Sequence, residues 1–210
     1  MKSSLLTLAV ATAVNAIPDI TVVPKENRCS NWPFFRQMSS VAGPFNIFAD
    51  STGKDIDGHK ASYTTISDVS IASAWTADMT EQLGISSIKD VAVPQIQCQA
   101  FGSAEMLAVN VDGQYQPLSI SEYFYHQYDG LIFVKTVTKG APIEPHWHYY
   151  PNGTRQDGTF LGWNNFTTWA YLLDEKSQKY RIRLLTDTSQ KLVDGEFTGF
   201  VRAGFPDLSD

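Results

Sequence analysis

Two histidines and a glutamate alternate along one short segment, and their types are suited to joint chemistry. Glu144, His146 and His148 are separated by single residues. If the segment is a β-strand, all three share one face with Tyr150, and Trp147 and Tyr149 lie on the other. Neutral imidazole binds zinc, copper, iron or nickel, and its pKa of about 6.5 suits proton transfer near neutrality. The pattern predicts a metal site or a proton-transfer site with Glu144, His146 and His148 as catalytic residues.

The metal interpretation is supported by only part of a motif. The spacing from Gly140 to the pair His146 and His148 resembles half of the first cupin motif. The glutamate of that motif would fall at Asn152 or Gly153, and the second cupin motif is not visible. We therefore expect no bound metal or cofactor, and a cupin-like metalloprotein is the second alternative to the function given below.

The same segment also has a structural interpretation. Aromatic-rich strands carry histidines as packing residues whose ring nitrogens bond to backbone or water. Pro145 favours a strand at a sheet edge, because proline has no backbone N–H to donate. A third interpretation is a non-metal pocket, with Tyr123, Tyr125, Trp147 and Tyr150 as its ligand-binding residues.

Other chemical motifs in the sequence are weaker. Asp50, Asp55 and Asp57 occupy a glycine-containing loop and could gather oxygens around calcium, but their spacing departs from the EF-hand pattern. The sequence contains no Gly-x-Ser-x-Gly elbow and no phosphate-binding glycine loop. Nucleophilic catalysis and nucleotide binding therefore have no support.

Short strands separated by tight turns must position these residues. Asp-Gly and Asn-Gly pairs recur from residue 57 onward, and these residues tolerate the positive φ of hairpin turns. One helix is expected over 76–83, ended by Gly84. The sequence predicts an all-β fold, an antiparallel sandwich or barrel with at most one or two short helices and one disulfide. The strands expected from the pattern are 104–111, 115–120, 131–138, 179–185 and 197–201.

The N-terminus has the three parts of a secretory signal peptide, predicted to span residues 1–16. Its apolar run is about half the roughly 20 residues that a spanning helix needs. Residues 17–44 are expected to form an N-terminal arm with the first cysteine, either irregular or with a short edge strand near 20–23. Together with a β-rich region over 45–210 this arm would make one globular domain.

The predicted secretion determines how the two cysteines and the charge are interpreted. In an oxidising compartment Cys29 and Cys98 are expected to form one disulfide, the alternative being two free thiols. Asn152 and Asn165 begin Asn-x-Thr sequons and are predicted glycosylation sites. The net charge of −6, with no basic run, argues against nucleic acid or an anionic membrane as partner.

Several short motifs resemble a group of small secreted β-rich proteins of filamentous ascomycete fungi, mostly uncharacterised, some labelled IgE-binding-protein-like. The resemblance implies a secreted fungal β-rich protein, supplies no catalytic residues, and extends over most of the chain that follows the signal peptide. The motifs are Cys29 near Asn-Trp-Pro, Ala42-Gly-Pro-Phe45, Cys98, Gln156-Asp-Gly-Thr-Phe-Leu-Gly162, Thr167-Thr-Trp169, Arg183-Leu-Leu185 and Leu192-Val-Asp-Gly-Glu196.

We therefore expect a secreted fungal glycoprotein that binds a host component, a glycan or a small apolar metabolite outside the cell. The alternative is a cofactor-free isomerase, cyclase or dehydratase of fungal secondary metabolism, with a His/Glu proton-transfer site. Small cavities lined by aromatic walls suit such work because they position a substrate. The partner would be a small molecule, a glycan or a host protein.

Overall fold

The computed structural model describes residues 17–65, 81–89, 93–120, 131–133, 140–187 and 190–205. Within these ranges the regular structure is β-strand, apart from one 3₁₀ turn, η1 (Cys29–Asn31). The strands are β1 (Thr21–Pro24), β2 (Phe35–Arg36), β3 (Val41–Asp50), β4 (Ala61–Thr65), β5 (Glu81–Ser86), β6 (Ile96–Phe101), β7 (Ala104–Val111), β8 (Gln114–Ile120), β9 (Leu131–Phe133), β10 (Glu144–Tyr149), β11 (Thr159–Gly162), β12 (Thr168–Asp174), β13 (Lys179–Leu184) and β14 (Phe197–Gly204).

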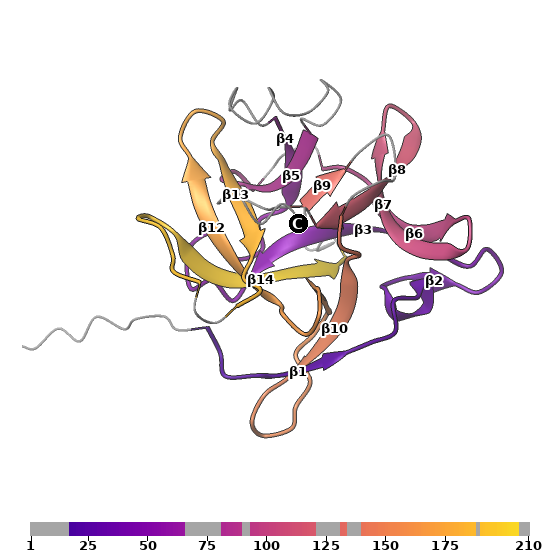
Figure 1. Cartoon of the computed structure of the whole chain (residues 1–210), viewed down its shortest axis with the longest axis horizontal. Coiled ribbons are helices and arrows are strands. Elements are labelled where there is room, and N and C mark those ends of the chain that lie inside the picture. Colours follow the sequence, from indigo (N-terminus) through magenta and orange to yellow (C-terminus); the bar gives the residue numbers. More distant parts are fainter. Residues whose placement is uncertain are drawn as a thin grey trace, which may run out of the picture.

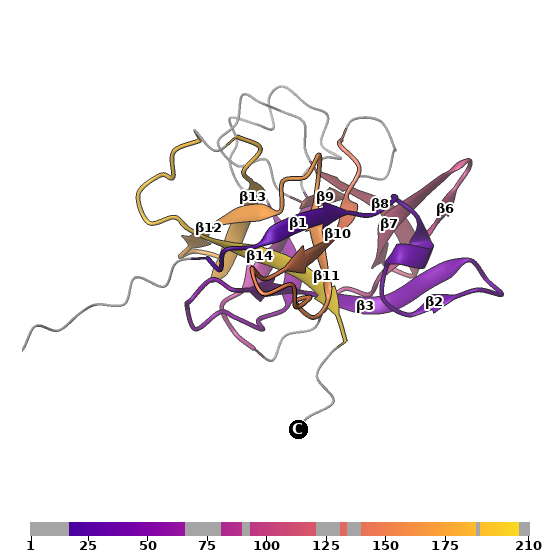
Figure 2. The same ribbon diagram turned by 90° about the horizontal axis from the view of Figure 1, so that it is seen from below.

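The strands form one curled antiparallel sheet (Figures 1 and 2). Hydrogen-bonded neighbours run in the order β1-β10-β11-β14-β12-β13-β5-β9-β8-β7-β6-β3-β2, and β4 pairs with β5. A further pairing joins β14 directly to β3, so the strands from β14 to β3 in this order form a closed ring. This confirms the all-β antiparallel prediction, and the closed circuit is the connectivity of a barrel rather than of two separate sheets.

The hairpin predicted around Asp112 and Gly113 is confirmed as β7 and β8, which pair along 108–111. Both turn residues have positive φ, 50° and 85°, which a two-residue hairpin turn requires. The strand predicted over 179–185 is β13, and the last predicted strand is β14. Of the strand predicted over 131–138, residues 131–133 form β9 and the remainder lies outside the described residues.

The predicted helix is wrong where the structure describes it. Residues 81–83 belong to β5, which continues through Gly84 to Ser86 and pairs with β4, β9 and β13. Leu83 and Ile85 alternate into the core and are 1% and 0% exposed, so burial in the sheet overrides the local helix propensity. Residues 76–80 lie outside the described ranges.

Large aromatic side chains fill the core. Trp169, Tyr171, Phe45, Phe160 and Phe200 are the largest fully buried side chains. Two of these five residues have a polar tip, and both tips are bonded. The Trp169 indole N–H donates to the Leu161 carbonyl at 2.9 Å, and the Tyr171 hydroxyl donates to the Phe200 carbonyl. These rings of the core come from β3, β11, β12 and β14.

The N-terminal arm packs onto the sheet. Its first part forms β1, which pairs with β10, so the edge-strand option is confirmed as Thr21–Pro24 (Figure 1). The Cys29–Cys98 disulfide is also present and joins η1 to β6. Residues 1–16, the predicted signal peptide, lie outside the described ranges. Among the described residues, none forms a helix long and apolar enough to cross a membrane.

Candidate functional site

The predicted alternation along β10 is confirmed, and it separates two different surfaces. His146 and His148 are both 0% exposed on the inner face, and the Glu144 side chain is 27% exposed. Trp147 and Tyr149 alternate with the histidines and are half-buried. β10 lies between β1 and β11, so the edge position expected from Pro145 is wrong.

Proline is tolerated there because of where β1 ends. The Pro145 carbonyl accepts a hydrogen bond from the Lys25 N–H at 2.9 Å, one residue beyond the end of β1. In an antiparallel strand the nitrogen and oxygen of one residue face the same neighbour. The missing N–H of Pro145 therefore faces the side on which β1 has already ended.

His148 is enclosed by aromatic rings. Its imidazole stacks on Phe160 with ring centroids 3.7 Å apart and meets the edge of Phe200 at 4.5 Å. Its Nε2 lies 3.0 Å from the Thr167 hydroxyl. Burial lowers the pKa of His148 to about 3, opposed by the Gln156 side chain and reinforced by His146. The ring is therefore neutral at ordinary pH, and Thr167 can donate its proton to Nε2.

Gln156 connects His148 to a partly buried ion pair, because its backbone N–H donates to the His148 carbonyl at 2.8 Å. The amide nitrogen of Gln156 donates to Asp50 Oδ1 at 2.9 Å, and Arg202 Nε donates to Asp50 Oδ2 at 2.7 Å. Among the described residues, His148 Nδ1 and Gln156 Oε1 are buried without a hydrogen bond of good geometry. The Gln156 side chain nevertheless opposes the lowering of the His148 pKa.

His146 has different surroundings. Its Nδ1 donates to the Glu144 carbonyl oxygen at 3.0 Å, and its Nε2 lies 3.8 Å from Glu144 Oε2. Burial lowers the pKa of His146, while hydrogen bonds and charge from Glu144, and the Phe160 backbone, raise it. Gly162 makes room for this ring: a Cβ there would lie 3.1 Å from His146 Cε1 and 2.2 Å from the Phe166 carbonyl oxygen.

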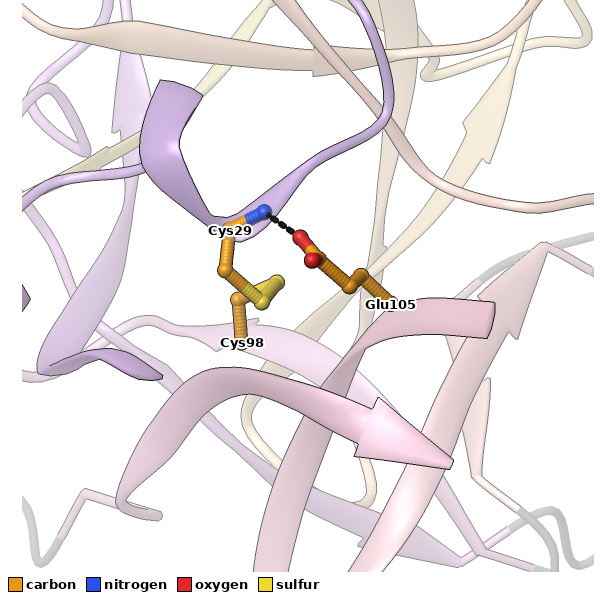
Figure 3. Close-up of side chains that lie close together, drawn as sticks. All are labelled: Cys29, Cys98 and Glu105. Carbon is orange, nitrogen blue, oxygen red and sulfur yellow. Dashed lines mark hydrogen bonds between the residues drawn. A yellow bond between two sulfur atoms is a disulfide. The ribbon is translucent and has the colours of Figure 1, made fainter. Parts of the chain in front are cut away.

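The three candidate catalytic residues do not converge as a metal site. Within the described ranges, the only group of three or more His, Cys, Asp or Glu with ligand atoms within 4.8 Å of one another is Cys29, Cys98 and Glu105. Its two sulfurs are consumed by the disulfide, and Glu105 accepts a hydrogen bond from the Cys29 N–H (Figure 3). That group is therefore structural.

The aspartate loop is also occupied by internal bonds. Asp57 accepts hydrogen bonds from the Thr52 N–H and hydroxyl, both at 2.8 Å, and from the Gly53 N–H at 3.1 Å. Asp50 is paired with Arg202. Among the described residues, Asp50, Asp55 and Asp57 do not bring three ligand oxygens together, so the calcium interpretation has no geometric support.

The outer face of β10 carries an arrangement that the sequence did not predict. Lys25 Nζ lies 3.8 Å, and Arg155 Cζ 4.7 Å, from the centre of a Trp147 ring. Tyr150, just beyond β10, is half-buried. The other predicted ligand-binding residues, Tyr123 and Tyr125, lie outside the described residues. The partnership of Arg155 with β10 follows from the hairpin turn at Asn152-Gly153, whereas that of Lys25 requires the long-range pairing of β1.

Both predicted glycosylation sites are exposed. Asn152 lies in a turn and its Oδ1 accepts the Thr154 N–H at 2.9 Å. Asn164 and Asn165 form a two-residue turn with φ of 50° and 68°, a conformation that asparagine tolerates. The two backbone hydrogen bonds that close it join Trp163 and Phe166 at 2.9 and 3.0 Å. The Asn152 and Asn165 side chains are therefore both accessible to solvent.

Comparison with known proteins gives no further assignment, since neither a protein-family model nor a curated protein matches the chain.

Proposed function

We propose that this protein is a secreted glycoprotein that acts by binding a partner outside the cell, without a catalytic role for its histidine pair. The observation that carries the proposal is the burial of His146 and His148, both 0% exposed. A general base must come within hydrogen-bond reach of a substrate proton. The two imidazoles lie within the core, and His148, with a pKa of about 3, is a weak base.

An extracellular location is supported by the covalent structure. A disulfide such as Cys29–Cys98 forms and persists in oxidising compartments. The sequons at Asn152 and Asn165 are exposed, as glycosylation requires. The predicted signal peptide and the resemblance to secreted fungal proteins point in the same direction.

Production of the full chain in a fungal secretory host tests this proposal. We expect the signal peptide to be removed, glycans on Asn152 and Asn165, and a deglycosylated mass two hydrogens below that of the reduced chain. Binding should be screened against extracellular glycans, host proteins and small apolar metabolites, with turnover of each compound followed in parallel.

Glu144 is the member of the candidate catalytic set that reaches the surface, so its variant separates binding from catalysis. Binding should be unchanged in Glu144→Gln and in the exposed control Glu175→Gln. Substrate turnover that is lost in Glu144→Gln and retained in Glu175→Gln would contradict the proposal and favour the proton-transfer enzyme.

A further inference from the structure

Three side chains form a row across the outer face of β10. Trp147 lies opposite Val23 of β1, and Tyr149 lies opposite Arg155 in an isolated bridge. Lys25 and Arg155 therefore reach the indole from the two neighbouring segments of chain. We call these residues the Lys25–Trp147–Arg155 row. Arg155 is exposed, and the other two are half-buried.

The two cations of the row have no carboxylate partner in the part of the chain that the structure describes, within the 4 Å of an ion pair. Four other arginines do have one: Arg28, Arg181, Arg183 and Arg202. The row is thus a locally positive surface on a chain of net charge −6. The cation–π attraction of Lys25 and Arg155 to the indole does not neutralise their charges. Both cations therefore remain available to an anion.

The surroundings of the row indicate what kind of anion would fit. Tyr149 lies opposite Arg155, on the same face of β10 as Trp147, and is half-buried, so a second aromatic ring extends the surface along β10. Aromatic rings offer apolar contact, and arginine binds carboxylates with two parallel hydrogen bonds. A polymer of uronic acids supplies both complements, because each sugar has a ring with apolar C–H faces and a carboxylate.

We propose that the Lys25–Trp147–Arg155 row binds an acidic, carboxylate-bearing polysaccharide. The inference rests on the proposed extracellular binding function and narrows it to one ligand class. A neutral glycan would leave both cations unpaired, and a small inorganic anion would make no contact with the aromatic rings.

Binding of the full secreted chain to polygalacturonate, with the neutral β-glucan laminarin as comparison, tests the inference. Polygalacturonate should bind at low ionic strength and weaken as salt is added, because exposed charge pairs are screened. Lys25→Gln and Arg155→Gln should each weaken binding about three- to five-fold, as expected for exposed ion pairs. Lys54→Gln is a matched control, since Lys54 Nζ lies 5.8 Å from the centre of the Phe197 ring, another cation–aromatic pair, and it should leave binding unchanged.

Each contrary outcome has a distinct meaning. No binding to polygalacturonate, or equal weakening by Lys54→Gln, would overturn the assignment of the row. Binding to laminarin alone would overturn the inference and leave the binding function intact. Stronger binding to polyglutamate than to polygalacturonate would replace the polysaccharide with an acidic protein segment. Failure of the proposed function itself would appear as substrate turnover that requires Glu144.

Discussion

Burial of His148 makes the stability of this protein depend on pH between 7.5 and 4.5. In the unfolded chain a histidine has a pKa of about 6.5, whereas burial lowers the pKa of His148 to about 3 in the folded protein. As the pH falls through 6.5 the unfolded state therefore gains a proton that the folded state does not. The free energy of unfolding must decrease on acidification until the pH approaches 3.

The size of the effect follows from the two pKa values. Each pH unit between them costs about 1.4 kcal/mol, so His148 should remove about 2.7 kcal/mol of stability between pH 7.5 and 4.5. His146 adds to the loss with the same sign, because burial also lowers its pKa. Asp174, whose pKa is lowered by hydrogen bonds from Ser177 and Lys176 despite desolvation, acts mainly below this window.

Urea unfolding followed by tryptophan fluorescence at several pH values measures this slope. In His148→Phe, a ring that can still pack against Phe160, the slope should fall by about 1.4 kcal/mol per pH unit, whatever the stability of the variant at pH 7.5. A wild-type stability constant to within about 0.5 kcal/mol over the window, or an unchanged slope in His148→Phe, would refute the assignment of a buried neutral imidazole.

Three further predictions concern the framework around the site. Arg183→Leu should lower the free energy of unfolding by about 3–5 kcal/mol, because the Glu196 side chain, 1% exposed and 2.7 Å from Arg183, would lose the partner of its buried charge. The double variant with Glu196→Leu should recover most of this loss in urea unfolding, and an additive loss would argue against coupling. Gly162→Ala should cost about 1–3 kcal/mol by overpacking, since its Cβ would meet a backbone oxygen at 2.2 Å; an unchanged melting temperature would show that the turn can shift. Replacing Cys29 and Cys98 with alanine should lower stability by about 4 kcal/mol, since the disulfide closes a loop with a sequence separation of 69; equal stability of the variant and the oxidised wild type would contradict this.

Local patterns predicted the fold class where neighbouring elements suffice. Asp112-Gly113 specifies a hairpin, and the alternation of 179–185 specifies a half-exposed strand, because side-chain period and turn conformation are properties of adjacent residues. The helix expected over 76–83 was wrong within β5 because good helix formers were weighted above the alternation of Leu83 and Ile85. Pairings such as β3 with β14 join distant segments and have no local signal.

For the candidate site too, local properties could be predicted from the sequence and long-range packing could not. Alternation along 144–149 correctly placed Glu144, His146 and His148 on one face, which is a local property. The burial of His148 depends on Phe160 and Phe200, which are supplied by β11 and β14. Sequence spacing carries no information on that long-range packing, so packing, catalysis and metal binding could not be told apart by sequence alone.

The position of β10 inside the sheet assigns different consequences to its two faces. The inner face faces the aromatic core, so substitutions at His146 or His148 should change stability and its pH dependence. The outer face carries Trp147 between two cations that have no ion-pair partner among the described residues. Substitutions of these cations should change the affinity for an anionic ligand. They should have little effect on stability, because exposed charge contacts contribute little to folding. On our proposal, a single strand with period-two alternation combines a structural histidine pair with a recognition surface. This separation predicts that the two sets of variants will not share a phenotype.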